Sequence, residues 1–370
     1  MSELPKGRSN TRRNIQIALS LAVVAIVFVF ALPQFADFSQ VWAVMREMTW
    51  LELLTLVAAA AWNIATYWIL MVGSLPGSNY WQAMKVNQAS TAIANTVPGG
   101  GAIGIGVTYA MYSAYGFSRN EVGLSVLVSG LWNNFAKLAL PIVALALLAV
   151  QGDAGTARLV AALVGIGGLV GALAMFALIL RSDRLARKIG DRFGSWVSSA
   201  RGLLHRPPVS DWGTAFAGFR RDAVDLLRRR WVWLTAATLV SHLSLYLVLL
   251  LSLRHVGVSD AEVGWAAVLA AFSFARLATA LPITPGGLGV VELVLAASLV
   301  SAGGPRAPVV AAVLIYRILT YVVPIGFGLL AYIKWSRGME ARKERAEERR
   351  RDHARERESA ARARVKEPTP

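Results

Sequence analysis

The stretch Leu281-Pro282-Ile283-Thr284-Pro285-Gly286-Gly287 interrupts an otherwise apolar segment, residues 263–302, near its middle. Proline removes a backbone donor and glycine permits sharp turns, so we expect two half-helices joined by irregular backbone. Ala94-Asn95-Thr96-Val97-Pro98-Gly99-Gly100 aligns with it and interrupts the apolar segment 81–116 in the same way. Each segment precedes a run with a central proline, Pro141 or Pro324. This pattern predicts an inverted repeat with an offset of about 185 residues.

The composition indicates a membrane protein. Hydrophobic residues make up 55% of the 370 residues and charged residues only 16%, against roughly 25% charged in a soluble domain. Charges are also segregated, since residues 15–32 contain none and residues 340–367 contain little else. The net charge of +16 could suggest nucleic acid, but Lys and Arg flank the apolar runs, which favours anionic lipid headgroups as partners and no nucleic acid.

Six apolar runs have about the 20 residues that cross roughly 30 Å of hydrocarbon. They are residues 15–33, 50–72, 122–150, 158–180, 231–251 and 309–333. Basic residues precede the first run, and residues 181–230 hold twelve Lys and Arg against five Asp and Glu. Both regions should therefore be cytoplasmic in a multi-pass protein of the plasma or inner membrane.

The expected fold is an all-α integral membrane protein with about six transmembrane helices and two re-entrant helical hairpins. Its parts are a cytoplasmic segment 1–14, a first membrane half 15–180, a connector 181–230, a second membrane half 231–335 and a charged cytoplasmic tail 336–370. Counting crossings makes hairpin 81–116 enter and leave from the cytoplasm, and hairpin 263–302 from outside. A half-helix such as 82–97 reaches roughly 24 Å, so the two broken tips should meet near the middle of the bilayer.

The connector contains an amphipathic stretch. Apolar residues from Trp212 to Leu227 recur at three and four residues, with arginines between and after them. We interpret it as a helix that lies on the cytoplasmic leaflet, with an ordinary connecting loop as the alternative.

Two helix breaks at membrane depth imply a site, because irregular backbone there must be satisfied by protein or by a watery cavity. Half-helices that start near Gly101 and Gly287 would direct their amides at this cavity, which favours an anion. Among the ionisable residues inside the apolar segments, the short list of candidates is Lys137, Arg276, Glu292 and Arg317. Their cations could bind a lipid phosphate while Glu292 orients an arginine or exchanges a proton.

Simpler roles remain open for the same residues. Glu292 could pair with Arg276 or Arg317 only to lock the helices, and Lys137 could extend its amine toward the interface. His242 could titrate, although a lone histidine in an apolar run more often has a packing role. The chain has no cysteine, no metal-ligand spacing and no recognisable catalytic or nucleotide-binding motif, so we expect no enzyme activity, cofactor or metal.

Two runs resemble a known family. Pro285-Gly286-Gly287-Leu288-Gly289-Val290-Val291-Glu292, followed by residues 311–317 and by Tyr321, Pro324 and Gly328, is similar to the lysylphosphatidylglycerol synthase transmembrane region, or flippase-like, family. Residues 87–106 resemble its first motif, and the resemblance covers roughly residues 15–335. It implies a place for Glu292 and Arg317 at a translocation site. Because the printed sequence ends in a short charged stretch and not in the aminoacyltransferase domain of the full synthases, we do not expect synthesis of the lipid here.

The leading hypothesis is a lipid flippase that moves an anionic phospholipid or a polyprenyl-phosphate-linked lipid between leaflets. A membrane subunit that presents a lipid to a separate transferase and a non-transporting scaffold are the alternatives, and a homo-oligomer stays open. The candidate lipid-binding residues are Asn95, Pro98, Gly99, Gly100, Lys137, Arg276, Pro285, Gly286, Gly287, Glu292, Tyr316 and Arg317.

Overall fold

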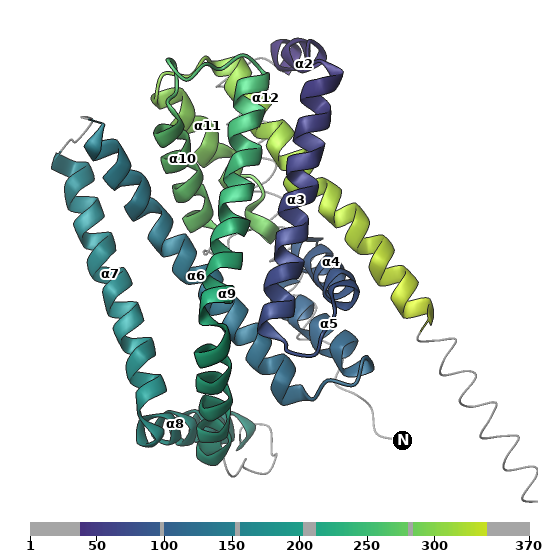
Figure 1. Ribbon diagram of the computed structural model, residues 1–370, viewed down its shortest axis with the longest axis vertical. Helices are drawn as coiled ribbons and strands as arrows, with labels where there is room; N and C mark the ends of the chain where they lie inside the picture. The colour runs from purple at the N-terminus through teal and green to yellow at the C-terminus, as the bar shows by residue number, and fades with distance from the viewer. Residues whose placement is uncertain (1–37, 97–99, 152–155, 203–211, 280–283, 339–370) are drawn as a thin grey trace, which may run out of the picture.

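The computed structural model describes residues 38–96, 100–151, 156–202, 212–279 and 284–338, and these ranges form helices with no strand (Figure 1). The all-α fold class is confirmed. Four helices are long and apolar enough to cross a membrane: α3 (Trp50–Ser74), α6 (Arg119–Val150), α9 (Trp212–His255) and the final helix, Arg306–Gly338. A fifth candidate is the pair α7 (Thr156–Arg181) and α8 (Asp183–Gly202), which bends by 91°.

These helices correspond to five of the six predicted spans. The first predicted span, 15–33, lies outside the described residues, as do segments 1–14 and 339–370. Helix α2 (Phe38–Arg46) precedes α3. Side-chain caps start α3 and α6, because Thr49 and Ser118 each accept a hydrogen bond from the backbone three residues on.

Both predicted hairpins are broken helix pairs. The first comprises α4 (Tyr80–Thr96) and α5 (Gly100–Ala114), and the second comprises α10 (Trp265–Ala278) and α11 (Val290–Ser301), with the 3-10 turn η3 (Pro285–Gly287) between them. The helices of each pair pack against each other. The outer ends of α4 and α5 lie toward the end of the molecule that carries α8, whereas α10 and α11 open at the opposite end (Figure 1). This arrangement agrees with oppositely directed hairpins; the inverted repeat stays a prediction.

The amphipathic stretch from Trp212 to Leu227 differs from its prediction. It is the first part of α9, a continuous helix of 44 residues, so the boundary at residue 230 falls inside a helix. At about 1.5 Å per residue, α9 is roughly 66 Å long, about twice the hydrocarbon thickness. Its apolar side packs against α8, where the backbone of Gly190 approaches Trp212 and Phe216. Helix α8 instead has the orientation expected of a helix on the membrane surface, because it is nearly perpendicular to the candidate span α7.

The final helix changes its winding beside the candidate site. Helix α12 (Arg306–Arg317) runs into a π-helical turn, η4 (Ile318–Val322), before the helix continues to Gly338. Pro324 follows this turn and cannot donate to the carbonyl four residues earlier, which explains the wider winding.

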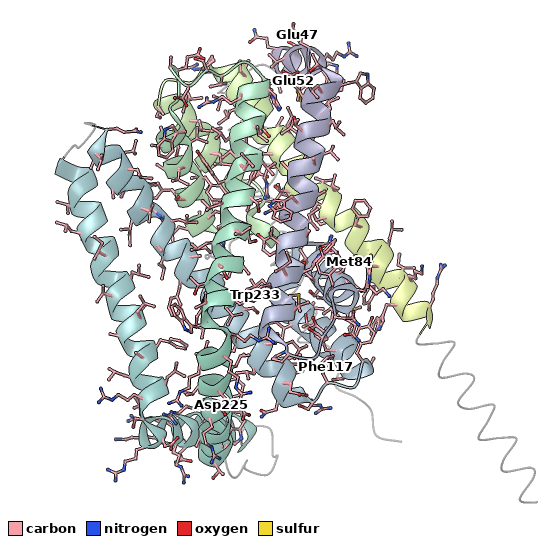
Figure 2. All side chains as sticks on the ribbon, in the orientation of Figure 1. Glu47, Glu52, Met84, Phe117, Asp225 and Trp233 are labelled. Carbon is pink, nitrogen blue, oxygen red and sulfur yellow. The ribbon has the colours of Figure 1, made fainter. Side chains whose placement is uncertain are left out.

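Apolar side chains lie on the outside of the bundle. Helix α7 exposes Leu163, Val164, Met175 and Leu178, and the final helix exposes Phe327 and Leu330. Charged side chains concentrate at the two ends, with Asp225 at the α8 end and Glu47 and Glu52 at the α2 end (Figure 2). An apolar middle between charged ends matches a multi-pass membrane protein.

Candidate functional site

The two hairpins meet at their broken ends. The η3 turn of the second hairpin contacts α4 of the first. Gly286 has a φ of +60°, and a Cβ added there would lie against the ring of Tyr321 and 2.9 Å from Oδ1 of Asn95. The Tyr321 hydroxyl donates a 2.8 Å hydrogen bond to the carbonyl of Asn95. The described end of the first half-helix therefore lies beside the second break, as expected, and the meeting of both breaks at mid-depth in the bilayer stays a prediction.

An ion pair fixes the second hairpin to the final helix. Nε of Arg317 lies 2.6 Å from Oε1 of Glu292, whose side chain is fully buried. Nη2 of Arg317 also donates to the carbonyl of Gly286 at 3.4 Å, and its guanidinium lies 4.3 Å from the ring centre of Tyr321. We name Asn95, Gly286, Glu292, Arg317 and Tyr321 the hairpin junction.

Glu292 also caps the start of α11. Its Oε2 accepts a 2.8 Å hydrogen bond from the amide of Gly289. This one amide is thus occupied by Glu292, and the expectation that the second half-helix offers its other first-turn amides to an anion stays a prediction. The pairing with Arg317 is one of the two pairings that the locking interpretation allowed, and it equally fits an arginine that Glu292 orients for binding.

A second group of charges lies where α6, α9 and α10 converge. Lys137 of α6 and Arg276 of α10 are close enough to interact electrostatically, and His242 of α9 is close to both. We name these three residues the cation cluster. Among the described residues, neither Lys137 nor Arg276 has a carboxylate within ion-pair distance.

Several polar atoms in the cation cluster, and in residues near it along the chain, have no described partner. Nε of Arg276, Nε2 of His242, Oγ of Ser241 and Oδ1 of Asn133 are buried without a hydrogen-bond partner among the described residues. Asn133 lies one helical turn before Lys137 on α6, so the two share a face. Unsatisfied buried polar atoms are few in native proteins, and a bound group is one explanation for a local concentration of them.

His242 is the residue to which sequence reasoning gave only a packing role. Its side chain is only 1% exposed, and Nδ1 lies 3.0 Å from the carbonyl of Thr238. A carbonyl oxygen only accepts, so Nδ1 carries the proton, and Nε2 is a buried acceptor without a partner among the described residues. The sequence shows a lone histidine in an apolar run, which does not distinguish this position from a packing residue. Tyr321 had a clearer signal, because it lies four residues after Arg317 on the same helix face.

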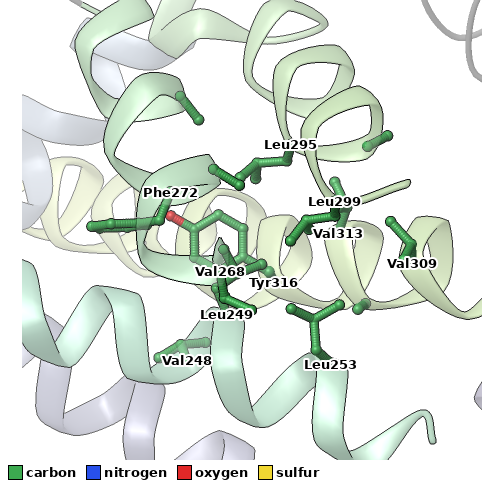
Figure 3. Close-up of a cluster of buried hydrophobic side chains, with 14 of the residues drawn as sticks. Val248, Leu249, Leu253, Val268, Phe272, Leu295, Leu299, Val309, Val313 and Tyr316 are labelled. Carbon is green, nitrogen blue, oxygen red and sulfur yellow. The ribbon is translucent and has the colours of Figure 1, made fainter. Parts of the chain in front are cut away.

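The other predicted residues have different surroundings. Tyr316 lies in the apolar core, with Val268, Leu249 and Phe272 around its ring (Figure 3), although it is within electrostatic reach of Arg276 and Arg317. Gly100 begins α5, where a Cβ would lie 2.5 Å from the carbonyl oxygen of Ala94. Pro285 and Gly287 form η3 with Gly286. Pro98 and Gly99 lie outside the described residues.

Within the described ranges, no three His, Asp or Glu side chains group closely enough to hold a metal ion. In the hairpin junction the charge of Arg317 is neutralised by Glu292. In the cation cluster Lys137 and Arg276 have no described counter-ion. This chemistry suits binding of an anion better than acid–base or nucleophilic catalysis.

The long apolar helices and the two facing broken hairpins define the class of this chain: it is an all-α, multi-pass integral membrane protein. The family model of the lysylphosphatidylglycerol synthase TM region matches residues 17–328, most of the chain, so the protein belongs to that family. The resemblance drawn from residues 285–292 and 311–317 is confirmed, and membership suggests a role in lipid handling. No curated protein sequence matches the chain.

Proposed function

We propose that the protein is a lipid translocase that moves an anionic lipid between the leaflets of the plasma or inner membrane. The observation that supports this most directly is the contact of two broken hairpins from opposite ends of the bundle, beside two cations without described counter-ions. Irregular backbone at membrane depth is characteristic of transporters, where it lines a site. Membership of a family named for a lipid synthase is consistent with a lipid cargo.

In this proposal the headgroup passes between the hairpins while its apolar chains stay in the bilayer. Arg276 and Lys137 attract the phosphate, and the hairpin junction holds the two halves in register. Among the described residues, η3 contacts α4 with Gly286 beside Asn95, and Tyr321 of the final helix contacts both of these residues. A small polar contact of this kind can open and reform, which alternating access requires.

The protein itself would then not be an enzyme. The alternative is a membrane subunit that presents a lipid to a partner transferase. Such a subunit would use the same anion site, but the lipid would stay in one leaflet of the bilayer. We place both termini and the α8 end in the cytoplasm, because α8 and the start of α9 carry the arginines of the connector.

The test is a leaflet-resolved assay in vesicles that contain the purified full chain. Fluorescent anionic lipid in the inner leaflet should become accessible to an external quencher in vesicles with the protein and not in empty ones. Arg276→Gln should slow transfer by tenfold or more, whereas Arg306→Gln, at the exposed start of α12, should leave it unchanged. Binding without transfer would instead favour the presenting subunit.

A further inference from the structure

The charge count of the cation cluster carries an inference about the cargo, which rests on the proposed function. Each charge placed in a low-dielectric region costs several kcal/mol unless it has a partner. Glu292 is committed to Arg317 and to the Gly289 amide. Lys137 and Arg276 therefore leave two positive charges that no described carboxylate offsets.

Neighbouring groups supply hydrogen-bonding capacity and no negative charge. Asn133, on the same face of α6 as Lys137, and His242 each have a buried atom without a partner among the described residues. The guanidinium of arginine binds phosphate oxygens with two parallel donors, and lysine adds a compact positive charge. The group that fits is small, has several acceptor oxygens and carries close to two negative charges.

We propose that the cation cluster selects a lipid whose headgroup is a phosphomonoester. Such a phosphate carries about −1.5 to −2 charges near pH 7 and offers three acceptor oxygens. A phosphodiester such as phosphatidylglycerol carries only one negative charge, so one of the two cations would keep an unbalanced positive charge. Lysyl-phosphatidylglycerol, with two amines and one phosphate, adds positive charge to a site already positive. The cluster therefore disfavours the aminoacylated cargo that the family name suggests.

The test measures binding rather than transfer. The full chain in nanodiscs of zwitterionic phosphatidylcholine is titrated with polyprenyl phosphate, phosphatidic acid, phosphatidylglycerol and lysyl-phosphatidylglycerol. Affinity is read from native mass spectrometry and from the rise in Tm with lipid concentration. Both phosphomonoesters should bind at least about tenfold more tightly than phosphatidylglycerol, given one additional charge contact. Equal affinity for polyprenyl phosphate and phosphatidic acid shows that the protein recognises only the headgroup. Higher affinity for one of them identifies the preferred apolar chain.

Variants separate a binding role from a packing role. Lys137→Met and Arg276→Met should each remove the preference for phosphomonoesters and raise the Tm of the lipid-free protein, because an uncompensated charge is lost. A packing role for these side chains predicts a lower Tm instead. Lys137→Arg keeps the charge and should keep the preference, and Arg306→Gln is the matched control for a cation outside the cluster.

The proposal is overturned if phosphatidylglycerol or lysyl-phosphatidylglycerol binds as tightly as the phosphomonoesters, or if the methionine variants retain the preference. Neither result touches the proposed function, since the vesicle assay decides whether any lipid crosses. If phosphomonoesters bind selectively but no lipid crosses, the binding role of the cation cluster stands and the proposed translocase function is wrong.

Discussion

At the scale of single residues, the Glu292–Arg317 pair is the strongest polar contact of the hairpin junction. Both charges are removed from solvent, with the Arg317 side chain 11% exposed and Glu292 fully buried. We expect Arg317→Gln to lower stability by about 3–5 kcal/mol, because it leaves a buried carboxylate without its cation. Thermal unfolding in detergent measures this loss.

The control is the more exposed pair of Arg220 and Asp183, whose side chains are 17% and 58% exposed. Asp183→Asn should cost no more than about 1 kcal/mol. The double variant Glu292→Gln/Arg317→Gln should recover part of the loss, since it removes both charges together. If Arg317→Gln unfolds at the wild-type temperature, Glu292 does not depend on this partner and the locking role is wrong.

Gly286 is a position where the fold requires glycine. Its φ is positive, and a Cβ would meet Tyr321 and Asn95. Gly286→Ala should destabilise by about 1–3 kcal/mol through backbone strain alone, with the steric clash in addition. Gly101→Ala is the control, because a Cβ there has open space. A Gly286→Ala protein with unchanged Tm would contradict the described contact between the hairpins.

At the scale of elements, the final helix packs closely on the first hairpin. A Cβ at Gly328 would meet the backbone oxygen of Gln88, and it would lie 2.6 Å from Cβ of Ala92, both residues on α4. The two helices therefore touch backbone to backbone, which small residues permit in membrane proteins.

We expect Gly328→Ala to destabilise the protein by about 1–3 kcal/mol, because α4 must shift to admit the methyl group. Gly326→Ala, two residues earlier with nothing within 4 Å, should be neutral or stabilising. The difference in Tm between these two single-methyl variants is the measurement. Equal values would show that α4 and the final helix do not touch at this level.

At the scale of the whole molecule, the natural absence of cysteine allows a direct test of orientation. Lys188→Cys places a thiol on α8, and Ala261→Cys places one between α9 and α10 at the other end of the bundle. Both positions are exposed. In intact cells, a membrane-impermeant maleimide should label the Ala261→Cys variant, and it should label the Lys188→Cys variant only after permeabilisation. The reverse pattern would invert the topology and the positions of both hairpin openings.

The sequence by itself determined the class and much of the order of elements. Hydrophobic length predicts spans, and proline with glycine predicts breaks, because both effects depend on the local chain and on the apolar solvent around it. The paired breaks at Pro98 and Pro285 indicated two hairpins, and the motif around Glu292 indicated the family.

Only the tertiary structure decided which charges are paired and which are not. Sequence reasoning left Arg276 and Arg317 as equal partners for Glu292, and the fold places Glu292 at the start of α11 within 2.6 Å of Arg317. It also places Lys137 and His242 beside Arg276, although these residues lie on three different helices far apart in the chain. The continuity of α9 through residue 230 was likewise hidden, since its first turns are stabilised by packing on α8. Pairing and burial depend on how distant segments come together in space, and hydrophobic periodicity reports only which side of a helix is apolar.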